Sequence, residues 1–170
     1  MYNNNKHCGI SFIVSAPAGS GKSSLVDKLI TERDDIIKNV SYTTRPPRPG
    51  EVDGRDYFFV SEEEFYRREK EFLETVSILG HRYATAKRSE GEKRHIFYVI
   101  DVEGAQNLMQ QMPCVTIFIS PPNLTELQRR LKKRNTETPA EINQRLLRAK
   151  KELAMIEFYK YHIVNDVFSH

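Results

Sequence analysis

A glycine-containing stretch near the N-terminus, residues 15–24, has the residue types needed to bind a polyphosphate. Its sequence is SAPAGSGKSS, placed between an apolar run and an amphipathic segment. The phosphate-binding loop has the pattern G-x-x-x-x-G-K-[ST] and joins a strand to a helix. The stretch matches that pattern at Gly21, Lys22 and Ser23, and it has Ala16 in place of the first glycine.

The chemistry of phosphate binding explains these residue types. Successive backbone N–H groups at a helix N-terminus surround an anion, and the helix dipole favours negative charge there. Gly19 and Gly21 allow the backbone to curve closely around it. Lys22 is a flexible cation that can reach the outer phosphates, and the Ser23 hydroxyl can bind Mg²⁺. An ordinary glycine turn into a helix is the less specific interpretation.

A second group of candidate residues is the proline-rich segment at 45–50, which reads RPPRPG. Three prolines in four residues hold such a loop extended. Arg45 and Arg48 on this stiff loop can converge on one anion, because guanidinium groups pair with phosphate through two hydrogen bonds. A solvated basic loop and a proline-rich recognition segment remain alternatives.

The apolar run at 95–100 ends in Asp101. Continuous apolar runs of this length are typical of buried parallel strands, whose carboxyl ends carry the ligand site in open α/β sheets. We therefore expect Asp101 to face the phosphate loop, near Mg²⁺ or a bound base.

Alternating strand and helix patterns must position these side chains. We expect strands at 9–15, 39–44, 54–60, 72–85 around a glycine turn, 95–101, 115–119 and 161–165, and helices at 22–33, 62–71, 103–112, 123–134 and 140–158. This order predicts a three-layer α/β fold with a parallel sheet, into which a β-rich segment is inserted.

Composition restricts the class of protein. The chain has 170 residues, of which 39% are hydrophobic and 29% charged, with a net charge of +3, which does not itself argue for nucleic acid. No apolar run reaches the roughly 18 residues that a membrane span needs, and the polar N-terminus lacks a signal-peptide core. Cys8 and Cys114 have no metal-ligand spacing and suit a reducing compartment. We expect a cytoplasmic protein.

The sum of these features resembles guanylate kinase, a P-loop nucleoside monophosphate kinase family. The resemblance covers nearly the whole chain and rests on four stretches: 16–24, 40–51 with 54–57, 72–85 and 129–138. It implies a P-loop kinase core at about 8–40, 95–128 and 146–170, a GMP-binding insertion at about 41–89, and a helical lid at about 129–145. It also implies transfer of a phosphoryl group from ATP to GMP with Mg²⁺, as part of purine metabolism.

The resemblance implies a role for individual residues. The ATP site would comprise Ala16, Pro17, Ala18, Gly19, Ser20, Gly21, Lys22, Ser23, Ser24 and Asn165. The GMP site would comprise Ser41, Arg45, Arg48, Tyr57, Glu74, Tyr83, Thr85 and Asp101. The catalytic residues would be Lys22, Arg45, Arg130, Arg134 and Arg145, and the metal ligands Ser23 and Asp101.

The chemistry of the base fits these roles. Guanine offers two N–H donors on one edge, which a carboxylate such as Glu74 can accept, whereas adenine has an acceptor at N1. The chain departs from the family at Thr85, where a serine is usual, and at Val99, where an acidic residue is frequent. The second departure puts a second metal carboxylate in doubt.

Two rival functions remain. A guanylate-kinase-like module could hold a partner peptide in the GMP pocket without catalysis, although such modules lose the phosphate-loop chemistry that Gly21, Lys22 and Ser23 retain here. A P-loop kinase for another nucleoside monophosphate is the other rival, and Glu74 with Ser41 argues against it. The sequence leaves open whether the protein is a monomer or a homodimer, and it predicts neither a nucleic-acid nor a membrane partner.

Overall fold

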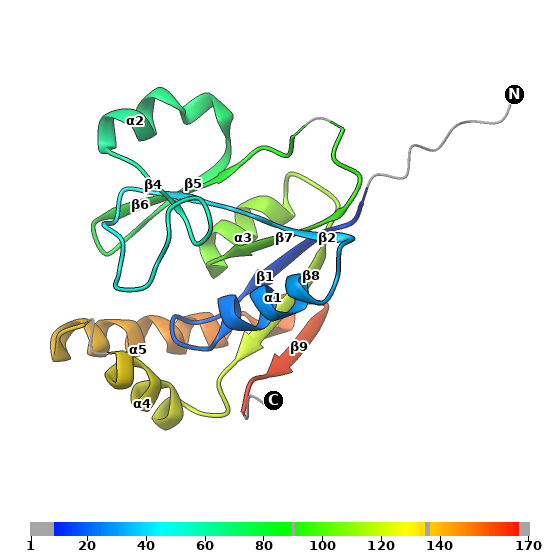
Figure 1. Ribbon diagram of the computed structural model, residues 1–170. Coiled ribbons are helices and arrows are strands. Elements are labelled where there is room, and N and C mark those ends of the chain that lie inside the picture. The colour runs from blue at the N-terminus through cyan, green and yellow to red at the C-terminus, as the bar shows by residue number, and fades with distance from the viewer. Residues whose placement is uncertain (1–8, 90, 135–136, 167–170) are drawn as a thin grey trace, which may run out of the picture.

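Five parallel strands form the main sheet of the computed structural model, which describes residues 9–89, 91–134 and 137–166. Their order is β2-β7-β1-β8-β9 (Figure 1). These strands are β1 (Ser11–Ser15), β2 (Ile36–Asn39), β7 (His95–Ile100), β8 (Val115–Ser120) and β9 (Tyr161–Val164). Because β1 is central and pairs in parallel with β7 and β8, the residues after it lie at the carboxyl edge of the sheet.

Helices cover both faces of this sheet. Successive residues of a strand point to opposite faces. Ile13 therefore packs in a core with α3 (Val102–Met109), whereas Val14 packs in a second core with α1 (Lys22–Thr31). Two apolar layers on a parallel sheet are the three-layer arrangement that the strand and helix order predicts.

A second, four-stranded sheet stands above the main sheet in Figure 1. Its strands follow the order β4-β3-β6-β5. They are β3 (Tyr42–Thr43), β4 (Phe58–Phe59), β5 (Phe72–Ile78) and β6 (His81–Ala86), with α2 (Glu62–Arg67) and the 3₁₀ helix η1 (Glu69–Glu71) packed nearby. This unit has a small core of its own around Phe65, Phe72 and Ala84.

Two helices on the lower left of Figure 1 complete the frame: α4 (Leu124–Arg134) and α5 (Pro139–Leu153). They pack together through Leu127, Leu131, Ile142 and Ala149. A capping box fixes the start of α5, since the Thr138 hydroxyl accepts from the Glu141 backbone N–H and the Glu141 carboxylate accepts from Thr138.

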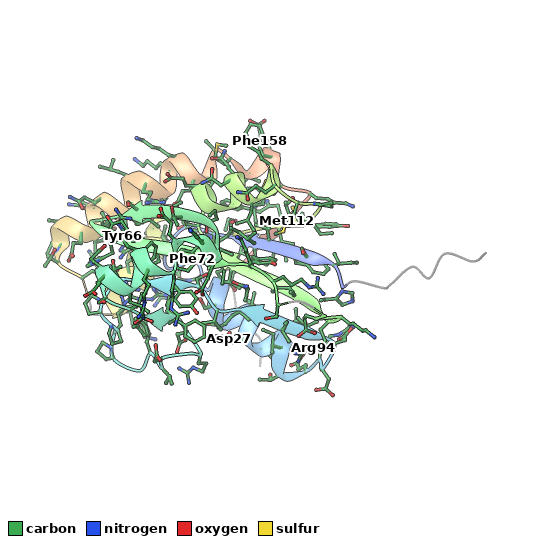
Figure 2. The ribbon with its side chains drawn as sticks, turned by 90° about the horizontal axis from the view of Figure 1, so that it is seen from above. Asp27, Tyr66, Phe72, Arg94, Met112 and Phe158 are labelled. Atoms are coloured by element: carbon green, nitrogen blue, oxygen red, sulfur yellow. The ribbon has the colours of Figure 1, made fainter. Side chains whose placement is uncertain are left out.

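Several elements differ from the sequence expectation. The strands expected at 39–44 and 54–60 are reduced to β3 and β4, of two residues each. The helix expected at 140–158 ends at Leu153 and is followed by the 3₁₀ helix η2 (Ile156–Phe158). This break lets Tyr159 pack edge-on against Phe118, with ring centroids 5.0 Å apart, while Phe158 projects outward in Figure 2. The helix expected at 62–71 is likewise divided into α2 and η1.

Strand β2 was not expected, because only two of its four residues are apolar. Some sequence predictions concern positions outside the described residues: Cys8, the polar N-terminus before it, and positions 135–136 of the lid. Among the helices that the structure describes, none combines the length and apolar character needed to cross a lipid bilayer.

Candidate active site

A cavity of about 350 Å³ lies where the carboxyl edge of the main sheet meets the second sheet and α5. It brings together residues that are far apart in the sequence. Those predicted from the sequence are residues 16–24, Ser41, Arg45, Arg48, Tyr57, Glu74, Tyr83, Thr85, Asp101, Arg134 and Arg145. Two further predicted residues, Arg130 and Asn165, lie outside the cavity lining.

The phosphate loop has the conformation that its glycines permit. Gly19 and Gly21 have φ of 93° and 86°, in the left-handed region. Gly21 is the N-cap of α1, so the first N–H groups of this helix face the cavity. A Cβ on Gly21 would lie 2.3 Å from Asn165 Nδ2, and Asn165 donates a hydrogen bond of 2.8 Å to the Ser20 carbonyl.

The Ala16 side chain packs in the apolar core, and the residue also lines the cavity. It is 4% exposed and lies in the apolar cluster with Val14 and Val26. Leu79 is the one non-glycine residue of the described chain with a positive φ, so the backbone at Ala16 needs no glycine. The substitution of the motif's first glycine is therefore compatible with the loop.

The Lys22 ammonium group points to the end of β7. Its Nζ donates a 2.5 Å hydrogen bond to the carbonyl oxygen of Ile100. Burial lowers the pKa of Lys22 to about 8, although the carboxylates of Asp101 and Glu152 oppose this shift. An anionic ligand would supply a stronger partner than a neutral carbonyl.

Glu74 is a buried carboxylate with one oxygen left open. It faces Thr85 across the β5–β6 pair, and the Thr85 hydroxyl donates a 2.6 Å hydrogen bond to its Oε1. Its Oε2 is buried and has no hydrogen-bond partner among the described residues. Burial raises the pKa of Glu74 to about 7, and the hydrogen bond from Thr85 limits the rise. Such an unpaired buried acceptor points to a missing ligand donor.

Asp101 is held from two sides. Its Oδ1 accepts from the Gly104 N–H at 2.8 Å and caps α3, and its Oδ2 lies 2.5 Å from Arg148 Nη2. Arg148 also donates to Glu152 at 2.7 Å. A Cβ on Gly104 would lie 3.0 Å from Glu74 Oε2, so the glycine lets the first turn of α3 approach that carboxylate.

The proline-rich loop is organised by Glu51. Its two oxygens accept from Arg45 Nη2 at 2.9 Å and from the Arg48 backbone N–H at 2.7 Å. The Arg45 guanidinium also lies over the ring of Tyr57, 5.5 Å from its centroid, and its Nε is buried without a hydrogen-bond partner in the described chain. Burial raises the pKa of Tyr57 to about 12, so its hydroxyl remains a donor.

The predicted lid arginines have different surroundings. Arg145 lies beside Glu137, with 2.6 Å between Nε and Oε1, and Arg134 lines the same cavity. Arg130 points elsewhere: its Nε donates to Glu126 at 2.7 Å and its Nη2 donates to the carbonyl of Asp166 at 3.0 Å.

Sequence reasoning missed four charged residues that organise the site: Glu51, Glu137, Arg148 and Glu152. One signal was available for Arg148, because it follows Arg145 by three positions and therefore shares its helix face. Helix spacing also offered a signal for Glu152, four positions after Arg148, and Glu51 lies within six positions of both loop arginines. The role of Glu137 depends on its contact with the distant Arg48.

Few side chains in the cavity could bind a metal ion. No group of three or more His, Cys, Asp or Glu side chains suited to a metal occurs within the described ranges. The exposed Ser23 lines the cavity, and so does Asp101, whose carboxylate is paired with Arg148. This donor set fits Mg²⁺ that is bound mainly by substrate phosphates and water.

Comparisons with known proteins agree with this geometry. Residues 10–170 match the sequence profile of the family described as Guanylate kinase. A guanylate kinase of Chlamydia felis is 48% identical over 91% of this chain and 79% of its own length. One from Protochlamydia amoebophila is 43% identical over 93% of this chain and 83% of its own length.

A solved structure supports the fold as well. The crystal structure of guanylate kinase from Anaplasma phagocytophilum is 33% identical, covers 94% of this chain and 78% of its own, and superposes with a TM-score of 0.74. The predicted α/β P-loop kinase fold and the phosphotransferase class are confirmed. The chain belongs to the guanylate kinase family, whose members use ATP and GMP as substrates.

Proposed function

We propose that the cavity carries out the family reaction directly, passing the γ-phosphoryl group of ATP to the phosphate of GMP to give ADP and GDP. The observation that carries this proposal is the unpaired, buried Glu74 Oε2 in the same cavity as an intact phosphate loop. The Glu74 carboxylate suits guanine and the phosphate loop suits a polyphosphate. A kinase must hold its two substrates close together, so it needs both features in one cavity.

The phosphate loop would hold ATP. Backbone N–H groups of the loop at 16–24, in which only Pro17 has none to offer, would surround the phosphates. Lys22 would exchange its bond to Ile100 for one to a phosphate oxygen. Asn165, bound to the loop at Ser20, would lie near the adenine.

Glu74 would read the base of GMP. Its ionised form can accept both guanine N–H donors, and Ser41, Thr85 and Asp101 would complete the pocket around the base. Adenine would leave a buried carboxylate facing an acceptor, and sites built on such complementarity discriminate by about 10⁴ or more.

Arginine and tyrosine side chains would hold the GMP phosphate: Arg45, Arg48, Tyr57 and Tyr83. In the transfer step an oxygen of this phosphate attacks the γ-phosphorus, and the bond to the β,γ-bridging oxygen breaks, leaving the electron pair on ADP. No general base is required, because the attacking oxygen is already ionised near pH 7. Lys22, Arg134 and Arg145 would stabilise the charge of the transition state.

Arg130 would join that group only after leaving Glu126, with which it is paired here. Mg²⁺ would be held by Ser23 and faced by Asp101, and would supply charge neutralisation between the phosphates. We assign the core to about 8–40, 95–128 and 146–170, the GMP-binding insertion to about 41–89 and the lid to about 129–145. We also assign the protein to purine metabolism in the cytoplasm.

Transfer of label from γ-labelled ATP tests the proposal. With GMP and Mg²⁺ present, the label should appear in GDP at the rate at which ADP forms. Label released as inorganic phosphate at that rate would identify an ATPase instead. GMP binding without any transfer would favour a binding module.

A further inference from the structure

Glu137 lies between two arginines that come from separate parts of the chain. Its Oε1 accepts a 3.1 Å hydrogen bond from Arg48 Nη2 and lies 2.6 Å from Arg145 Nε. Arg48 belongs to the proline-rich loop of the second sheet, and Arg145 belongs to α5. The Glu137 side chain is only 4% exposed, so this contact is shielded from water.

The cluster is electrostatically incomplete. Glu137 Oε2 and Arg145 Nε are both buried without a hydrogen-bond partner in the part of the chain described, so the close approach of Arg145 is an ion pair and not an aligned hydrogen bond. Arg134 interacts with the same set of charges. Buried polar groups without partners are rare in native proteins, and the unpaired donor at Arg145 Nε suggests that an acceptor on a ligand completes it.

The charge balance at this end of the cavity indicates the kind of ligand. Four guanidinium groups, those of Arg45, Arg48, Arg134 and Arg145, share two carboxylates, Glu51 and Glu137. The excess of two positive charges equals the charge of a fully ionised phosphate monoester. Glu51 and Glu137 therefore neutralise the four arginines only in part, which leaves the arginines able to bind phosphate.

We propose that Glu137 is a positioning residue that aligns Arg48 with the phosphate of GMP and Arg145 with the transferred phosphoryl group. The inference rests on the roles proposed above for these two arginines. A single carboxylate oxygen fixes the spacing of both guanidinium groups, and it joins α5 to the GMP-binding insertion. Arginine misplaced by about 1 Å can reduce a rate on the order of 10²-fold.

Glu137→Gln tests the charge while keeping the size of the side chain. We expect kcat to fall about tenfold or more and KM for GMP to rise, with KM for ATP within about threefold, because the phosphate loop is untouched. Glu64→Gln is the matched control: Glu64 also pairs with two arginines, Arg67 and Arg68, but these two, unlike Arg48 and Arg145, do not line the cavity. A kcat of Glu137→Gln within about twofold of the parent would overturn the proposal.

Double variants separate positioning from a structural role. In an Arg145→Met background, Glu137→Gln should still raise KM for GMP but should lower kcat less than threefold further, since it acts on kcat through Arg145. In an Arg48→Met background, the effect on KM should vanish and the effect on kcat should remain. Equal multiplicative losses in every background, with lowered melting temperatures, would mean that Glu137 only stabilises the fold. Parental kcat in Arg145→Met alone would instead refute the proposed role of the arginine.

Discussion

Glu74→Gln should weaken catalysis with GMP and stabilise the folded protein at the same time. The carboxylate is 8% exposed, and its pKa is raised from an ordinary value of 4.5 to about 7, chiefly by burial. The ionised form is therefore disfavoured in the folded state by about 3 kcal/mol. GMP binding would require the ionised form of Glu74, because only the carboxylate accepts hydrogen bonds from both guanine N–H donors.

The stability effect has a definite sign. Between about pH 4.5 and pH 7 the carboxyl group keeps its proton in the folded protein but loses it in the unfolded chain. The free energy of unfolding therefore falls as pH rises through this window, and the loss is complete above it. Glutamine does not ionise. The melting temperature of Glu74→Gln relative to the parent should thus be higher at pH 8 than at pH 5 by on the order of 5 °C or more. Any misfit of the amide is present at both pH values and cancels.

The catalytic effect has the opposite sign. Glutamine keeps one acceptor but presents an N–H₂ group to the second guanine donor, at a cost of about 3 kcal/mol. The specificity constant for GMP should fall on the order of 10²-fold, measured by coupled ADP formation at pH 8. Glu71→Gln, at an exposed carboxylate paired with Arg68, is the control and should change neither quantity. Unchanged GMP turnover in Glu74→Gln would refute this assignment of base recognition, and an equal shift in melting temperature at both pH values would refute the burial argument.

Further outcomes are expected from the same geometry. The specificity constant for GMP should fall about tenfold per pH unit below pH 7, because Glu74 becomes protonated. The specificity constant for ATP should fall above pH 8, because Lys22 of the free enzyme loses its charge. Specificity constants that do not change between pH 6 and 9 would contradict both predictions. Lys22→Ala should lower kcat by far more than it weakens GMP binding, which rapid kinetics and calorimetry can compare. Gly21→Ala should abolish ATP binding in a titration, because a left-handed φ of 86° and the Asn165 amide 2.3 Å away exclude a methyl group. Thr138→Ala should destabilise the start of α5 by about 1 kcal/mol in denaturant unfolding.

Local sequence patterns predicted most of the fold because they have direct physical causes. The residues of β1, β7 and β8 form nearly continuous apolar runs, which are typical of strands buried on both faces. Asn123 caps α4, since its side-chain oxygen accepts a 2.8 Å hydrogen bond from the Glu126 N–H. Strand β2 was not predicted, because its extended conformation depends on parallel pairing with β7, which is distant in the sequence.

The candidate site was predictable where a residue type alone carries the chemistry. Lys22 and the arginines of the proline-rich loop line one cavity. Glu74 lines it as well, but only the family resemblance pointed to that residue. Glu137 and Arg148 were not predicted, because each acts through partners brought together only by folding: Arg48 and Arg145 in one case, and Asp101 in the other. Helix spacing also predicts the pairing of Arg130 with Glu126, four positions apart. The sequence does not tell whether Arg130 stays paired with Glu126 or turns to the substrate phosphates.

The most direct test of the account is ADP formation from ATP and Mg²⁺ with GMP, AMP, CMP, UMP or dTMP as the acceptor, and with none. The arrangement of Glu74, Thr85 and the phosphate loop predicts turnover with GMP and little with any other acceptor. Preferred turnover with AMP or a pyrimidine nucleotide would contradict the role of Glu74, and no turnover with any acceptor, in a protein shown to be folded, would contradict the catalytic function itself.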